Sequence, residues 1–188
     1  NVRGLTKDDL MTLLSICIPT RNRINCLKET IGSIIDDGVE PSLYEIIISD
    51  NSDNDEVEKY VKRLSVKKIN IHYYKNEVKG FYNSINALSY GNGDFLKLHN
   101  DYSKFKKGSF KYLIELIKEN KKSKPMIFFS NGELKAKEVL TTASSFNDFI
   151  ACTSYLNTWS SAFSIWKTDF INTKHDVQSV DSMFPHTS

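Results

Sequence analysis

Three short polar clusters in this sequence contain side chains that could bind a divalent cation or a phosphate group. They are Thr20-Arg21-Asn22, Asp50-Asn51-Ser52 and His99-Asn100-Asp101, and each directly follows a run of mostly apolar residues. Carboxylate oxygens suit Mg²⁺ or Mn²⁺, and these ions usually also contact substrate phosphates. Arg21 or Arg23 could pair with phosphate oxygens. The residue types therefore indicate chemistry on a phosphorylated ligand.

Each cluster taken alone has a simpler structural explanation. Arg21 could be a surface charge, and Asp50 and Ser52 could serve the N-terminus of the next helix. Asp101 could cap a turn. Taken together the clusters favour a site, because ligands in open α/β sheets bind outside the carboxyl ends of the strands. We therefore expect Asp101 to bind a metal ion and Asp50 to accept hydrogen bonds from a base or ribose.

The segments that must position these clusters alternate between apolar strands and amphipathic helices. Strands are expected at 13–19, 44–49, 69–74, 95–98, 125–130 and 162–166. The first helix is expected to run from Asn25, its N-cap, to Gly38. A second is expected over 57–64, because Asp53 and Glu56 before it have capping-box spacing. Two more are expected between Gly80 and Gly91 and over 110–117. This alternation predicts an α/β fold with a mostly parallel central sheet.

Composition excludes several functional classes. Lys and Arg (25) nearly balance Asp and Glu (23), which disfavours a nucleic-acid-binding protein. The sequence has no G-x-G-x-x-G after the first strand and no P-loop, which disfavours a dinucleotide oxidoreductase or P-loop enzyme. Its three cysteines lack metal or disulfide spacing and fit a reducing compartment. We expect a cytoplasmic protein whose Lys-rich helix ends give at most peripheral contact with the inner face of a membrane.

The order and spacing of these motifs resemble the opening of family 2 glycosyltransferases of GT-A fold. The resemblance covers roughly residues 13–115 and rests on four segments: Leu14 to Arg23, Ile46 to Asp53, Asn76 to Gly80 with Asn83, and Gly93 to Asp101. It implies a GT-A domain with helices flanking the sheet and a Rossmann-like nucleotide-binding half. We expect this domain at residues 11–188, with 13–115 as the nucleotide-sugar-binding half and 116–188 as an acceptor-side half truncated at its C-terminus. Residues 1–10 are expected to be an extension added for expression.

The resemblance also assigns roles to individual residues. It places the ribose and base at Pro19, Thr20, Arg21 and Asp50, and extends the nucleotide site to Ser52, Gly80, Asn83 and Asn100. The D-x-D element of the family, which binds the metal and the diphosphate, falls on His99 and Asp101. Mn²⁺ or Mg²⁺ is the implied cofactor. Because His99 stands where the family has an acid, the metal site should be weaker or more selective for Mn²⁺.

The catalytic base for the acceptor hydroxyl is expected later in the chain. Asp181 is the candidate that we favour, with Asp169 and His186 as alternatives, although a solvated loop acid explains Asp181 about as well. Trp159 and Trp166 could stack on an acceptor sugar, but core packing is the commoner role for tryptophan.

The implied activity is transfer of a hexosyl group from a nucleotide-diphosphate sugar to a saccharide or lipid-linked saccharide. Inversion at the anomeric carbon and a role in bacterial surface polysaccharide or glycoconjugate synthesis are implied by the resemblance alone. Two alternatives stay open. A sugar-phosphate nucleotidyltransferase would share the α/β plan, but the loop Thr20–Arg23 lacks the glycines expected of one. His99 favours a non-catalytic nucleotide- or sugar-binding module.

Overall fold

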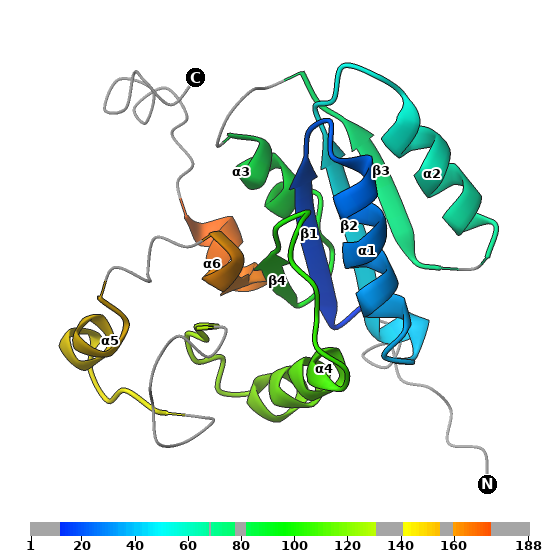
Figure 1. Ribbon diagram of the computed structural model, residues 1–188. Coiled ribbons are helices and arrows are strands. Elements are labelled where there is room, and N and C mark those ends of the chain that lie inside the picture. The colour runs from blue at the N-terminus through cyan, green and yellow to red at the C-terminus, as the bar shows by residue number, and fades with distance from the viewer. Residues whose placement is uncertain (1–11, 68, 78–81, 131–140, 155–159, 174–188) are drawn as a thin grey trace, which may run out of the picture.

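A five-stranded sheet lies at the centre of the computed structural model, which describes residues 12–67, 69–77, 82–130, 141–154 and 160–173 (Figure 1). The strands are β1 (Leu14–Thr20), β2 (Tyr44–Asp50), β3 (Ile71–Lys75), β4 (Phe95–Leu98) and β5 (Ser164–Trp166). Their order is β3-β2-β1-β4-β5. The first four run parallel and β5 pairs antiparallel with β4. The predicted α/β fold with a mostly parallel central sheet is confirmed.

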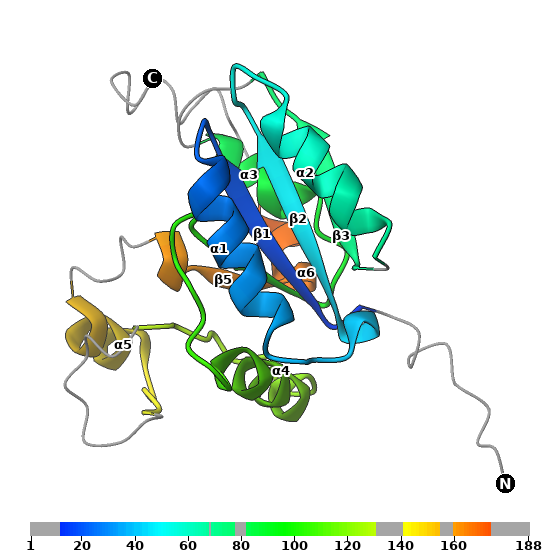
Figure 2. The ribbon, with the colours of Figure 1, turned by 45° about the vertical axis from the view of Figure 1, so that its right-hand side comes forward.

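Helices cover both faces of the sheet, so the inner strands β1, β2 and β4 are buried on both sides. One face packs against α1 (Ile24–Ile35), α2 (Glu56–Ser65) and α4 (Ser109–Asn120). The other face packs against α3 (Tyr82–Ser89) and α6 (Lys167–Asn172), as Figures 1 and 2 show. α5 (Phe146–Thr153) and two short 3₁₀ turns, Pro41–Leu43 and Ser160–Ala162, complete the described elements. No helix in the described ranges is long and apolar enough to cross a bilayer.

The start of β4 is fixed by a buried carboxylate at the amino edge of the sheet. Glu45 of β2 accepts hydrogen bonds from Ser15 Oγ at 2.6 Å and from Gly93 N at 3.2 Å. A Cβ on Gly93 would lie 2.7 Å from backbone atoms of Leu14 and Ser15, so no other residue fits without a backbone shift. This packing sets the register of β4 on β1. It thereby determines where the polar residues after β4 emerge.

β1 continues through Pro19 to Thr20, whereas the sequence predicted that Pro19 would end the strand. Thr20 O accepts from Asn51 N on the β2 side, and Cys17 O accepts from His99 N on the β4 side. The missing N–H of Pro19 therefore faces the β4 side, just beyond the last paired residues, Cys17 and Leu98. The ladder loses no hydrogen bond there.

The predicted strand at 125–130 is wrong: this segment is irregular. Its carbonyls bond to side chains of β5 instead of to a ladder, since Trp166 Nε1 donates to Pro125 O at 2.8 Å and Ser164 Oγ to Ile127 O at 2.6 Å. Trp166 is 2% exposed and packs edge-to-face on Phe95, so it is a core residue. Two helix starts also differ from the expected ones. α1 begins after Arg23, not Asn25. The N-cap of α2 is Asp55, which makes no side-chain capping bond, and Glu56 N donates to Asn54 Oδ1 at 3.1 Å.

Candidate functional site at the carboxyl edge of the sheet

The three polar clusters lie together at the carboxyl edge of the sheet. Thr20 and Asp50 are register partners at the ends of β1 and β2. His99 directly follows β4 and donates its backbone N–H to Cys17 O of β1 at 2.9 Å. Because β1 lies between β2 and β4, residues from three strand ends face one region of the protein surface. The convergence expected from the sequence is present in the structure.

Asp101 is the best-supported side chain in this region. Its Oδ2 accepts a hydrogen bond from Thr20 Oγ1 at 2.8 Å, and its Oδ1 lies 3.3 Å from Arg23 Nη1. The Thr30 hydroxyl of α1 donates to the Asp101 carbonyl at 2.9 Å. The Asp101 side chain is only 5% exposed. Contacts from β1, α1 and the residue before α1 thus hold this carboxylate in place, as binding a metal ion requires.

His99 presents one unused nitrogen in the same region. Its Nε2 lies 3.0 Å from Ser103 O, and because a carbonyl can only accept, Nε2 carries the hydrogen. Nδ1 then holds a lone pair, and this buried atom has no partner among the described residues. Burial, followed by the nearby charge of Lys97, lowers the pKa of His99 to about 3, so the ring is neutral. Stacking on Phe105 at 4.7 Å fixes its plane.

Asp50 is completely buried and is held by three neighbours. Its Oδ1 accepts from Ser52 N at 2.9 Å, and its Oδ2 accepts from the Tyr73 hydroxyl at 2.9 Å. Lys75 Nζ lies 3.9 Å from Oδ2 and also donates to Ser52 O. Burial and then the hydrogen bond to Asp50 raise the pKa of the Tyr73 phenol, which therefore stays protonated. The carboxylate that is predicted to recognise the nucleoside is thus rigidly positioned.

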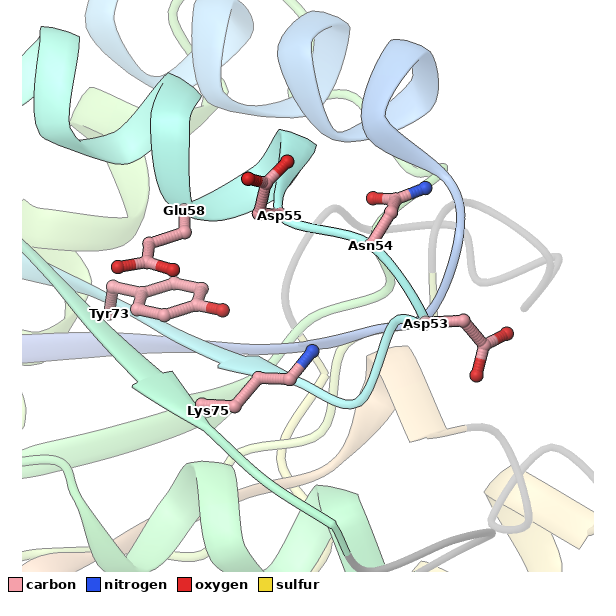
Figure 3. A pocket seen from close by; sticks show the side chains of 6 residues that line it. All are labelled: Asp53, Asn54, Asp55, Glu58, Tyr73 and Lys75. Carbon is pink, nitrogen blue, oxygen red and sulfur yellow. The ribbon is translucent and has the colours of Figure 1, made fainter.

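A cavity of about 480 Å³ lies beside Asp50 and is lined by Asp53, Asn54, Asp55, Glu58, Tyr73 and Lys75 (Figure 3). Tyr73 and Lys75 come from β3, and Asp55 and Glu58 come from the start of α2. Because Tyr73 and Lys75 both contact Asp50, this space adjoins the carboxyl edge of the sheet.

The loop after β1 is tied to the loop after β2. Asn22 lies in the left-handed region at φ 55°; its Nδ2 donates to Asp53 Oδ2 at 2.7 Å, and its Oδ1 accepts from the backbone N–H of Asp53 at 3.0 Å. Its backbone N–H donates to Ser52 Oγ at 2.8 Å. Arg21 lies 3.8 Å from Asp53, and both side chains are exposed. The predicted nucleotide residues Arg21 and Ser52 therefore belong to one cross-linked pair of loops.

Asn83, another residue predicted to bind the nucleotide, lies in a buried amide network. Its Oδ1 accepts from Ser49 Oγ at 2.7 Å and from Asn76 Nδ2 at 3.1 Å, and its Nδ2 donates to Ser49 O at 3.0 Å. This network joins α3 to β2 and to the end of β3. Asn100 donates to the Tyr102 hydroxyl at 3.1 Å. The nucleotide contacts assigned to Asn83 and Asn100 stay predictions.

Several predicted residues lie outside the described ranges: Gly80, Trp159, Asp181 and His186. Asp169, the alternative base, lies on α6 and lines a second, mostly apolar cavity of about 350 Å³ between the 125–128 segment, α5 and β5. This cavity includes Trp166 and Phe95 in its wall. No general base is therefore assigned here.

Sequence reasoning missed three residues that organise the site: Thr30, Tyr73 and Lys75. Thr30 lies among Leu27, Ile31 and Ile34 on the buried face of α1. A hydroxyl on such a face was the available signal, since a buried polar group needs a partner. Tyr73 and Lys75 carry no comparable signal, because their contacts with Asp50 depend on how β3 pairs with β2.

The donor set for a divalent cation is small. Among the described residues, no group of three or more His, Cys, Asp or Glu side chains could by itself hold a metal ion. The Asp101 oxygens and the unpaired Nδ1 of His99 are donor types that such an ion takes, and its remaining ligands would come from water and a bound diphosphate. An imidazole nitrogen suits Mn²⁺ better than Mg²⁺.

Comparison with known proteins shows the family. The sequence pattern of glycosyl transferase family 2 matches residues 15–175. No curated protein matches the chain significantly.

Three crystal structures of TarS from S. aureus share the fold. TarS 1–349 superposes with a TM-score of 0.61 at 16% identity, over 86% of this chain and 49% of TarS 1–349. Its complex with UDP gives a TM-score of 0.50 at 18% identity, over 58% and 33% of the two chains. A third TarS structure gives 0.53 at 16% identity, over 71% and 24%. This chain thus spans less than half the length of these relatives. The chain belongs to glycosyl transferase family 2 and has a GT-A fold.

Proposed function

We propose that this chain is the nucleotide-sugar-binding part of a glycosyltransferase that moves a hexosyl group from a nucleoside diphosphate to an acceptor hydroxyl. The observation that carries the proposal is the placement of Thr20, Asp50 and Asp101 at one sheet edge, with Thr20 bonded directly to Asp101. Membership of family 2 supports the reaction class. TarS 1–349, which shares the fold, binds UDP in its crystal structure.

The nucleoside is proposed to bind near Asp50 and the loop of Arg21. The buried carboxylate of Asp50 is held rigidly by Tyr73 and Lys75, and the cavity of about 480 Å³ next to it has the size of a small-molecule site. Arg21 lies on the loop that rises from β1 and is half-exposed, so it is available to the ligand.

The diphosphate is proposed to lie between the ends of β1 and β4, beside Asp101 and His99. Mn²⁺ or Mg²⁺ would be held there by Asp101 and by His99 Nδ1, and when bound it would neutralise charge on the departing diphosphate. Thr20 and Thr30 keep Asp101 oriented. Arg23 supplies a further positive charge beside the same group.

Acceptor attack needs a base from the later part of the chain, and Asp181 is our proposal for that role. A carboxylate there would take the proton of the acceptor hydroxyl as its oxygen attacks the anomeric carbon from the face opposite the diphosphate. The bond from that carbon to the diphosphate would break as the new bond forms, which inverts the anomeric carbon. Surface polysaccharide or glycoconjugate synthesis on the inner side of a membrane is the proposed setting. The acceptor is proposed to be a saccharide or lipid-linked saccharide.

Calorimetry tests the donor site. UDP, GDP, CDP and dTDP are each titrated with Mn²⁺ and with EDTA into wild type, Asp101→Asn and Glu29→Gln. Glu29→Gln is the matched control, because it removes an exposed carboxylate of α1 that pairs with Lys104. We expect one nucleotide to bind in a metal-dependent way, with affinity reduced at least about tenfold in Asp101→Asn only. Absence of binding by all four nucleotides would contradict the proposal.

A further inference from the structure

The one full negative charge at the end of β4 is already paired within the protein. Asp101 Oδ1 lies 3.3 Å from Arg23 Nη1, while Oδ2 is taken by Thr20. His99 adds no negative charge, because it supplies an imidazole where the family pattern has an acid. The guanidinium of Arg23 therefore balances Asp101 before any ligand arrives.

Arg23 is held loosely compared with Asp101. Its side chain is 56% exposed, whereas that of Asp101 is 5% exposed. The remaining contact that the structure gives its guanidinium is with the face of the Tyr102 ring, at 5.4 Å. Arg23 occupies the N-cap position of α1 but makes no side-chain capping hydrogen bond. Half-exposed ion pairs of this kind shift an equilibrium by less than about fivefold, so Arg23 can leave Asp101 at small cost.

A divalent cation at Asp101 would meet this guanidinium directly. Arg23 and the cation would share the single carboxylate of Asp101, and two cations that share one carboxylate repel each other. The negative diphosphate of a bound nucleotide offers Arg23 a different partner, with donor geometry that suits phosphate oxygens.

We propose that Arg23 competes with the metal ion for Asp101 and is released to the diphosphate when metal and nucleotide bind. This inference rests on the proposed metal and diphosphate site. The free protein should therefore bind the metal weakly. Metal and nucleotide should each raise the affinity for the other, because the metal displaces Arg23 from Asp101 and the diphosphate gives Arg23 another partner.

Direct titration of Mn²⁺ into the nucleotide-free protein tests the competition, with free Mn²⁺ followed by electron paramagnetic resonance. The proteins are wild type, Arg23→Gln, Arg23→Lys, Asp101→Asn and Lys104→Gln. Lys104→Gln is the matched control, because it removes one positive charge three residues from Asp101 that pairs with Glu29. Thermal melting confirms that each variant is folded.

Arg23→Gln is expected to bind Mn²⁺ about twofold to fivefold more tightly than wild type, the range that the strength of a half-exposed ion pair allows. Arg23→Lys should stay close to wild type because the charge is kept, Lys104→Gln should change less than twofold, and Asp101→Asn should lose binding. At saturating Mn²⁺, Arg23→Gln should bind the nucleotide selected by the calorimetric panel more weakly. A merely structural role of Arg23 would not make Mn²⁺ binding tighter and nucleotide binding weaker in the same variant.

Unchanged or weaker Mn²⁺ binding by Arg23→Gln, with loss in Asp101→Asn, would overturn the competition and leave the metal site at Asp101 intact. Wild-type Mn²⁺ binding by Asp101→Asn, or none by any protein, would overturn the inference as well. Nucleotide binding in EDTA would then still support the glycosyltransferase proposal, so the two failures are distinguishable.

Discussion

Lys97 of β4 should make the stability of this protein depend on pH in a way that one substitution removes. Its side chain is buried in the sheet two residues before His99, with residue exposure of 3%. The ammonium donates to Ser161 O at 2.6 Å and lies 4.3 Å from the centre of the Phe129 ring. Burial lowers the pKa of Lys97 from 10.5 to about 7.

The direction of this pH dependence follows from the pKa of Lys97, which is 10.5 in the unfolded chain and about 7 in the folded protein. Between about pH 7 and 10.5 the unfolded chain holds a proton on Lys97 that the folded protein has largely lost, so the free energy of unfolding rises with pH in this window. Below about pH 7 Lys97 is charged in both states, and burial of its charge lowers the free energy of unfolding by the full amount. At about 1.4 kcal/mol per pKa unit it amounts to about 5 kcal/mol, of which about 2 kcal/mol is recovered between pH 7 and pH 9.

Lys97→Met keeps an unbranched, flexible side chain that is one heavy atom shorter, and it removes the titrating group. Urea unfolding followed by circular dichroism at pH 7, 8 and 9 gives the free energy of unfolding of both proteins. We expect the stability of wild type to rise relative to Lys97→Met by about 2 kcal/mol over this range. Lys104→Met, at an exposed lysine, should follow the wild-type profile. Parallel profiles for wild type and Lys97→Met would refute the reasoning.

The remaining predictions concern packing and the support of Asp50. Gly93→Ala should lower the free energy of unfolding by about 1–3 kcal/mol, because its Cβ would meet backbone atoms at 2.7 Å. Gly32→Ala, at an open position of α1, should raise the free energy of unfolding by about 0.5–1 kcal/mol. Equal melting temperatures for Gly93→Ala and Gly32→Ala would contradict this difference in packing. Tyr73→Phe should cost about 1–3 kcal/mol in urea unfolding because Asp50 loses a buried donor, whereas Tyr112→Phe at an exposed position should cost almost nothing; equal costs would argue against the hydrogen bond.

The sheet and the convergence of its polar ends could be predicted from the sequence because both depend on local patterns. Apolar runs that end in polar residues mark β1, β2 and β4, and their parallel arrangement follows from the helices between them. Once these strands are neighbours, Thr20, Asp50 and His99 must share an edge.

The segment at 125–130 shows where local patterns fail. Its apolar residues look like a strand, but their burial comes from contact with β5, some forty residues later in the chain. A short stretch of sequence does not show whether its carbonyls will bond to a neighbouring strand or to side chains, as the carbonyls of this segment do. The pairing of Asp101 with Arg23 was equally hidden, because a residue at a helix start has no preferred partner eighty residues away.

Paramagnetic relaxation in the NMR spectrum would locate the metal ion and the nucleotide on the sheet. Mn²⁺ together with the nucleoside diphosphate that binds best broadens the amide resonances closest to the ion. We expect broadening at Thr20 and Asp101, and none at Leu14 and Tyr44, which begin β1 and β2 at the opposite edge of the sheet. Asp101→Asn should abolish the effect. Broadening centred on the apolar cavity beside β5, or spread without preference for the carboxyl edge, would contradict a nucleotide-sugar site at this position.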